Sequence, residues 1–108
     1  MSFTGNEDHS ITLDDASEMT KNYRDANPDD IKGHFFGKAA IQAILDQDQC
    51  VGIRIYYGIS TGSTTNPPQK QLIVVGVLEN QDDLYNGSIA DKSMICPPAC
   101  STGNPLNQ

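Results

Sequence analysis

The order of apolar and polar positions predicts two helices in the first half of the chain. Residues 11–27 repeat apolar side chains at helical spacing, with Thr12 placed as the N-cap and Pro28 at the end. Glycines interrupt residues 28–37, so we expect a short turn of helix there, followed by a better helix over 38–47. The first helix has a narrow apolar stripe and must pack against other elements to be stable.

The period changes to that of β-strands after residue 49. Residues 50–59 alternate, with Val51, Ile53, Ile55, Tyr57 and Ile59 on one face and Gly52, Arg54, Tyr56 and Gly58 on the other. Residues 71–79 are apolar on both faces, so we expect both faces to be covered. The two strands are predicted to pair as an antiparallel hairpin with a long loop over 60–70.

These elements predict an α+β fold, in which N-terminal helices pack on a central antiparallel β-hairpin or small meander. We expect a flexible leader over 1–10, one domain over 11–95 and an extended, irregular tail over 96–108. Residues 84–95 fit either a short strand or irregular chain. The predicted core consists of Leu13, Tyr23, Ile31, Phe35, Phe36, Ile41, Ile44, Leu45, Val51, Ile53, Ile55, Tyr57, Ile73, Val75 and Val77. A hairpin alone is marginally stable, which favours additional sheet or a homodimer.

The charge of the chain excludes some partners. Its 14 acidic and 7 basic side chains give a net charge of −7 over 108 residues. Nucleic-acid binding depends on Lys and Arg that displace counterions, and anionic membranes attract the same residues. We therefore expect neither a nucleic acid nor a membrane as partner. The start of the chain lacks the features of a signal peptide, so we expect a cytoplasmic protein.

Three cysteines are the most specific chemical feature. Cys96 and Cys100 are separated by Pro97, Pro98 and Ala99, and a tight turn would be needed to bond their sulfurs. Three alternatives remain open for the cysteines. The first is free structural thiols, and the second is a disulfide or redox pair. The third is a zinc or iron–sulfur site, whose candidate ligands are Cys50, Cys96, Cys100 and His34. No cofactor is required by the sequence.

Arg54 and Tyr56 form the second candidate site, because they share the more polar face of the first strand. The glycines beside them let a ligand approach the backbone, and Arg54 would then bind a carboxylate or phosphate. The alternative is that Arg54 pairs with a carboxylate of the chain itself or lies along Tyr56. Nothing in the spacing places a histidine beside Cys50, so no catalytic pair is evident and we lean against an enzyme.

Several motifs resemble a set of small uncharacterised bacterial proteins across residues 11–107. The motifs are Phe-Phe-Gly-Lys at 35–38, Cys-Val-Gly-Ile-Arg-Ile-Tyr-Tyr-Gly at 50–58, Ile-Val-Val-Gly-Val at 73–77, Cys-Pro-Pro-Ala-Cys at 96–100 and Asn-Pro-Leu at 104–106. This resemblance implies a single-domain family of bacterial proteins and carries no activity with it.

A second resemblance, to the A-type iron–sulfur carriers, covers fragments only. It consists of Ile-Thr-Leu at 11–13, Gly-Ile-Arg at 52–54 and paired cysteines near the end. In that family the first cysteine follows the strand and the closing pair has one intervening residue. Here Cys50 precedes the strand, and three residues separate the closing pair. The resemblance implies an iron–sulfur cluster.

Together these observations predict a small non-enzymatic binding or assembly module that acts through protein–protein contacts or self-association. The alternative is a thiol-based metal or redox protein that uses Cys50, Cys96 and Cys100.

Overall fold

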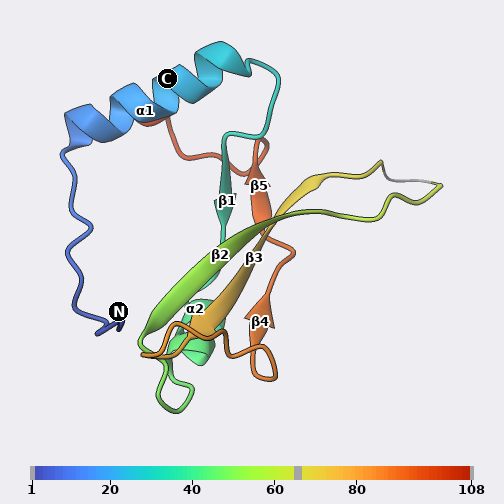
Figure 1. The fold of residues 1–108 in the computed structure, drawn as a ribbon. Coiled ribbons are helices and arrows are strands. Elements are labelled where there is room, and N and C mark those ends of the chain that lie inside the picture. The colour runs from blue at the N-terminus through green and yellow to red at the C-terminus, as the bar shows by residue number, and fades with distance from the viewer. Residues whose placement is uncertain (1, 65–66, 108) are drawn as a thin grey trace. The chain divides into compact units, whose positions relative to one another are not determined.

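The computed structural model describes residues 2–64 and 67–107 and has an α+β fold (Figure 1), as predicted. The elements are α1 (Leu13–Ala26), β1 (Gly33–Phe35), α2 (Lys38–Leu45), β2 (Gly52–Ile59), β3 (Lys70–Val77), β4 (Ile89–Ala90) and β5 (Met94–Cys96). No helix in the described residues is long and apolar enough to cross a membrane.

The contacts divide the chain into two compact units. The sheet unit comprises Met1–Glu7 and Phe36–Ser93. The second unit comprises Asp8–Phe35 and Met94–Gln108, and we call it the disulfide unit because it contains a disulfide between Cys96 and Cys100. The first residues belong to the sheet unit, where the backbone N–H of Phe3 donates to the carbonyl of Glu79 at 2.8 Å. This grouping differs from the predicted division into a leader over 1–10, a domain over 11–95 and a tail over 96–108. That division stays a prediction.

The sheet unit contains the predicted hairpin. β2 and β3 pair antiparallel from Gly52↔Val77 to Ile59↔Lys70, and β4 adds a third strand beside β3 (Figure 1). β3 is therefore the central strand and β2 forms one edge. The expected meander is present, and residues 84–95 contain two short strands, β4 and part of β5.

The core lies on β3 and under α2. Ile44 of α2 and three valines of β3 are the buried apolar side chains among the described residues: Val74, Val75 and Val77. The valines are buried on both faces of β3, as its apolar sequence predicted. Ile44, Val75 and Val77 were predicted to be core residues, whereas Val74 was not.

The prediction that β2 buries its apolar face is wrong. Ile53, Ile55 and Tyr57 were expected in the core but are 40%, 47% and 93% exposed. α2 has eight residues and is about 12 Å long, whereas the eight-residue strand spans about 27 Å. The helix is too short to cover the whole face, so it covers the central strand and leaves most of β2 open.

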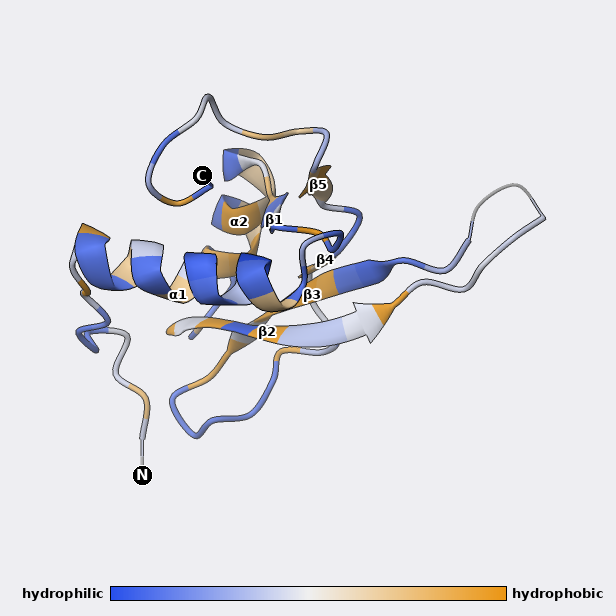
Figure 2. Cartoon of the chain, turned by 90° about the horizontal axis from the view of Figure 1, so that it is seen from above, coloured by the Kyte–Doolittle hydropathy of each residue, from blue (hydrophilic) through white to orange (hydrophobic). Residues whose placement is uncertain are grey.

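In the disulfide unit, α1 begins as predicted. The Thr12 hydroxyl accepts a hydrogen bond from the N–H of Asp15 at 3.0 Å, and acidic residues fill the first turn. No residue of α1 is buried, and its surface is largely hydrophilic (Figure 2). Leu13 and Tyr23 are 55% and 42% exposed, so their assignment to the core is wrong. The Tyr23 hydroxyl donates to Asp30 at 2.5 Å instead of packing inside.

The expected turn of helix within residues 28–37 is also wrong at its centre. Gly33–Phe35 forms β1, which pairs antiparallel with β5 from Gly33↔Cys96 to Phe35↔Met94. Glycine is a poor helix former, and a distant strand supplies the backbone partners. Phe35 is 58% exposed and Leu45 is 41% exposed, which corrects two further core assignments. The remaining predicted core residues are half-buried: Ile31, Phe36, Ile41, Val51 and Ile73.

Candidate functional site

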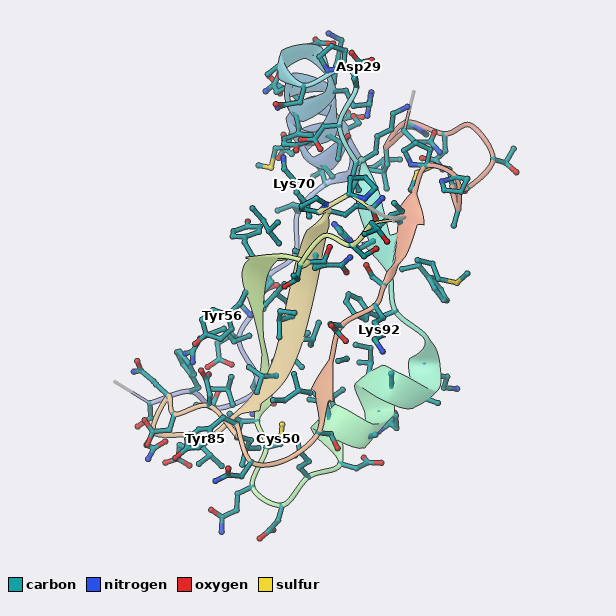
Figure 3. All side chains as sticks on the ribbon, turned by 90° about the vertical axis from the view of Figure 1, so that its right-hand side faces the viewer. Asp29, Cys50, Tyr56, Lys70, Tyr85 and Lys92 are labelled. Carbon is teal, nitrogen blue, oxygen red and sulfur yellow. A yellow bond between two sulfur atoms is a disulfide. The ribbon has the colours of Figure 1, made fainter. Side chains whose placement is uncertain are left out.

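Arg54 and Tyr56 lie on one face of β2 and share a single carboxylate. The Arg54 guanidinium donates through Nη1 to Oδ1 of Asp83 and, at 3.2 Å, to the carbonyl of Gln81. The Tyr56 hydroxyl donates to the other oxygen of Asp83, Oδ2, at 2.5 Å. Figure 3 shows Tyr56 on the hairpin between Lys70 at one end and Cys50 at the other. Asp83 therefore occupies the position in which a bound carboxylate would meet Arg54.

An aromatic ring completes this polar cluster. The Arg54 Cζ atom lies 6.0 Å from the centroid of the Phe3 ring, within the range of a cation–π contact. The cluster thus joins three segments of the sheet unit: the N-terminal residues, β2 and the segment after β3 in which Asp83 forms a β-bridge with Val77. Pairing with a carboxylate of the chain itself was the alternative expected for Arg54. Binding of a small anion by Arg54 and Tyr56 stays a prediction, and an anion would have to displace Asp83.

The cluster shifts three pKa values. The Tyr56 hydroxyl, followed by the Arg54 guanidinium, lowers the pKa of Asp83 from its usual 3.8 by bonding to the charged carboxylate. The same hydrogen bond raises the pKa of Tyr56 above its usual 10.0, because the phenol must keep its proton to donate. Asp83 also raises the pKa of Arg54, which stays charged.

These shifts predict how stability depends on pH. Because the folded pKa of Asp83 is lowered, its contribution is complete above the unfolded value near 3.8 and is lost as pH falls through the folded pKa. Because the pKa of Tyr56 is raised, its contribution is complete below about 10.0 and is lost as pH rises through the folded value. The unfolding free energy of the Asp83→Asn variant, measured with urea, should show neither of these two pH dependences.

Asp82→Asn is the matched control, because it removes the same charge from the neighbouring position. The unfolding free energy of Asp82→Asn should decrease at acid and at alkaline pH in the same way as that of the unmodified chain. Identical pH profiles for the Asp83→Asn variant and the unmodified chain would show that the cluster contributes nothing to folding.

Of the three alternatives for the cysteines, the structure contains a disulfide between Cys96 and Cys100. Their Cα atoms are 4.8 Å apart. The required tight turn is formed by hydrogen bonds from Ala99 N to Ile95 O and from Cys100 N to Pro98 O, both at 2.9 Å. The Lys32 N–H donates to the Cys96 carbonyl at 2.6 Å, which joins the bonded turn to the segment before β1.

The other two candidate metal ligands have different surroundings. Cys50 is a free, half-buried thiol of the sheet unit, and its Sγ donates to the carbonyl of Gly52 at 3.2 Å. His34 lies on β1 opposite Ile95 in the disulfide unit, and partial burial lowers its pKa. Within residues 2–64 and 67–107, no group of three or more His, Cys, Asp and Glu is placed to hold a metal ion. Zinc and an iron–sulfur cluster stay predictions.

A row of exposed apolar side chains is the largest difference between the expected and the observed surface. Ile53, Ile55, Tyr57 and Ile59 share one face of β2 and are exposed by 40%, 47%, 93% and 74%. We call these four residues the β2 row. The alternation of the sequence placed them on one face, but it could not show that this face is open. The roles of Phe3 and Asp83 were also missed, because both lie far from β2 in the sequence.

Comparisons with known proteins give no indication of function, so the β2 row is the main guide to it. No protein family model, curated protein or solved structure matches the chain. Both resemblances noted from sequence motifs therefore stay predictions.

Proposed function

We propose that this chain is a small non-enzymatic binding or assembly module that acts in the cytoplasm through protein–protein contacts. The observation that carries the proposal is the β2 row. Exposed apolar side chains that are contiguous and not scattered are typical of interaction sites. Tyr57 is 93% exposed, and tyrosine is among the residues most enriched at the centres of interfaces.

The hydrogen-bonding state of the polar groups supports binding over catalysis. Asp83 accepts hydrogen bonds from Arg54 and Tyr56, the two polar side chains on the face of β2 opposite the β2 row. The β2 row itself contains one hydroxyl and no charge. Such a surface binds by excluding water from apolar side chains, and the phenol of Tyr57 is its one group capable of acid–base chemistry. The net charge of −7 argues against nucleic acid as the partner.

A photo-crosslinking amino acid at position 57 tests this proposal. The full chain with this substitution is illuminated in an extract of its own cells, and adducts are separated by mass. We expect adducts with protein, including a second copy of the chain. The control carries the same amino acid at Tyr85, which is 72% exposed in the same unit but outside the row. Equal adducts from both positions, or none from position 57, would refute the proposal.

The disulfide supports a second candidate function, thiol–disulfide exchange. A thiolate of a dithiol partner would attack one sulfur of the Cys96–Cys100 bond to form a mixed disulfide. The partner's second thiol would then release it, leaving Cys96 and Cys100 reduced and the partner oxidised. Cys100 is exposed and Cys96 is half-buried, so exchange is sterically feasible. Equilibration in glutathione buffers gives the reduction potential, and a potential below about −300 mV would favour a purely structural disulfide.

The disulfide also makes a prediction about stability. It closes a ring of five residues, for which the chain-entropy relation gives a stabilisation of about 2 kcal/mol. The double variant Cys96→Ser/Cys100→Ser should therefore increase amide exchange in β1 and β5, the strands that the bonded turn adjoins.

Amide exchange in β2 and β3 is the internal control for that variant and should change little. Before reduction, the denatured unmodified chain should react as one free thiol, that of Cys50, and after reduction as three. Three reactive thiols before reduction would contradict the disulfide. Stoichiometric zinc or iron in the same protein before it is denatured would favour the metal site.

A further inference from the structure

The open edge of β2 and the β2 row belong to the same four residues. In an antiparallel pair, successive residues direct their backbone N–H and C=O alternately toward the partner strand and away from it. The N–H of Leu84 donates to the carbonyl of Gly76 at 2.8 Å, so the backbone N–H and C=O of Gly76 point away from β2. The backbone N–H and C=O of Ile53, the register partner of Gly76, must then point away from β3.

The other end of the hairpin has the same phase. The N–H of Ser60 donates to the carbonyl of Gln69 at 2.8 Å, one step beyond the pair Ile59↔Lys70. The even-numbered residues of β2 therefore bond to β3. The odd-numbered residues, Ile53, Ile55, Tyr57 and Ile59, direct their N–H and C=O groups to the outer edge. In the described part of the chain this edge pairs with no other strand.

We propose that a second copy of this chain pairs with this edge, β2 against β2 in antiparallel orientation, to give a continuous six-stranded sheet. This inference rests on the proposed function and names its partner. The twofold axis passes through Tyr56, which sets the register Ile53↔Ile59 and Ile55↔Tyr57 in both halves. Every outward N–H and C=O of the strand then has a partner, and each side chain of the β2 row lies opposite another.

The register is set by the length and the ends of the strand. A pairing centred on Ile55 would place Ile59 opposite Val51. The N–H of Val51 is not available, because it donates to the carbonyl of Val77 at 2.9 Å inside the sheet unit. Centring on Tyr56 uses all four outward residues, which maximises the number of new hydrogen bonds.

The distribution of charge favours a second copy as the partner. Residues 49–78 contain the basic Arg54 and Lys70 and no acidic residue, although the whole chain carries a net charge of −7. Two hairpins can therefore meet without bringing carboxylates together, while each slightly basic hairpin attracts the acidic remainder of the other copy. The outward residues include no Lys or Pro, the usual protection of a strand edge against self-pairing.

Sedimentation velocity of the full chain from about 5 to 500 μM tests the inference. One paired strand buries less than the roughly 800 Å² per partner of a standard interface, so we expect a reversible dimer that dissociates on dilution. Ile55→Pro removes one outward N–H without removing a bond to β3, and Tyr57→Lys adds a charge at the edge. Each should weaken dimerisation at least tenfold, whereas the control Tyr85→Lys should not change it.

A cysteine crosslink tests the register. Residues that face each other in a non-hydrogen-bonded antiparallel pair have Cα atoms about 4.5 Å apart, within reach of a disulfide. In a background with Cys50→Ala, Tyr56→Cys should form a covalent dimer in oxidised glutathione, whereas Arg54→Cys, which faces Gly58, should not. Equal crosslinking of both variants would overturn the register.

The two proposals fail separately. A chain that stays monomeric to 500 μM overturns self-pairing. If position 57 still gives crosslinked adducts to a different protein, the binding function stands with another partner. If position 57 gives no adduct and the chain is monomeric, both proposals fall. Circular dichroism of each variant must match the unmodified chain, so that a loss of dimer does not reflect unfolding.

Discussion

Ile44→Ala is expected to cost about 2–5 kcal/mol of unfolding free energy, the range measured for large-to-small changes at buried aliphatic residues. Ile44 is 1% exposed and is the buried side chain that α2 contributes to the core. The other buried apolar side chains of the described residues are three valines of β3. In so small a core, the cavity left by Ile44 has few neighbours that could fill it, so the sheet unit should be largely unfolded near physiological temperature.

Leu45→Ala is the matched control for this prediction. Leu45 is the next residue of the same helix and is 41% exposed, so truncation should cost less than about 1 kcal/mol. The measurement is urea unfolding followed by circular dichroism, with amide exchange in β3 to localise the effect. Similar losses for both variants would mean that α2 does not pack on β3 as described.

Gly76→Ala is expected to destabilise the sheet unit by about 1–3 kcal/mol, the usual cost of overfilling a packed site. A Cβ atom at this buried position would lie 2.9 Å from Gln47 Nε2, 3.0 Å from Cys50 Sγ and 3.1 Å from Leu84 Cδ1. Gln47 cannot easily move, because its amide donates to the carbonyl of Ile44 and accepts from the N–H of Ser88, both at 2.9 Å. The crowding therefore comes from two segments at once, the turn over 47–50 and the segment that contains Leu84.

Gly58→Ala provides the control on the neighbouring strand. A Cβ atom there would meet the side chain of Ile73 at 3.5 Å, an ordinary van der Waals contact. Replacing glycine in a strand interior generally favours the folded state, so Gly58→Ala should be neutral or slightly stabilising. The midpoint of thermal unfolding should therefore fall for Gly76→Ala and stay unchanged or rise slightly for Gly58→Ala. A neutral Gly76→Ala would contradict the packing of Gln47, Cys50 and Leu84 over β3.

The local features of the fold could be predicted from the sequence. Alternation located the β2–β3 hairpin, the apolar run at 71–79 predicted a covered central strand, and Thr12 marked the start of α1. Each of these signals depends on neighbouring residues only. The pairing of β1 with β5 joins segments about 60 residues apart, and no local pattern distinguishes Gly33–Phe35 from a turn.

The candidate site shows the same limit. Arg54 and Tyr56 were found because they share a strand face, but their partner Asp83 lies 27 or more residues away. The β2 row was placed correctly on one face, but three of its four residues, Ile53, Ile55 and Tyr57, were assigned wrongly to the core. Alternation shows which side chains share a face, whereas the length of α2 decides how much of that face is covered.

Amide hydrogen exchange along β2, measured by NMR at low and high protein concentration, tests the central claim most directly. The N–H groups of Arg54, Tyr56 and Gly58 bond to β3 and should be protected at every concentration. The N–H groups of the β2 row should exchange rapidly in dilute solution and become protected as the concentration rises. Rapid exchange of the β2 row at all concentrations would contradict self-pairing at this edge.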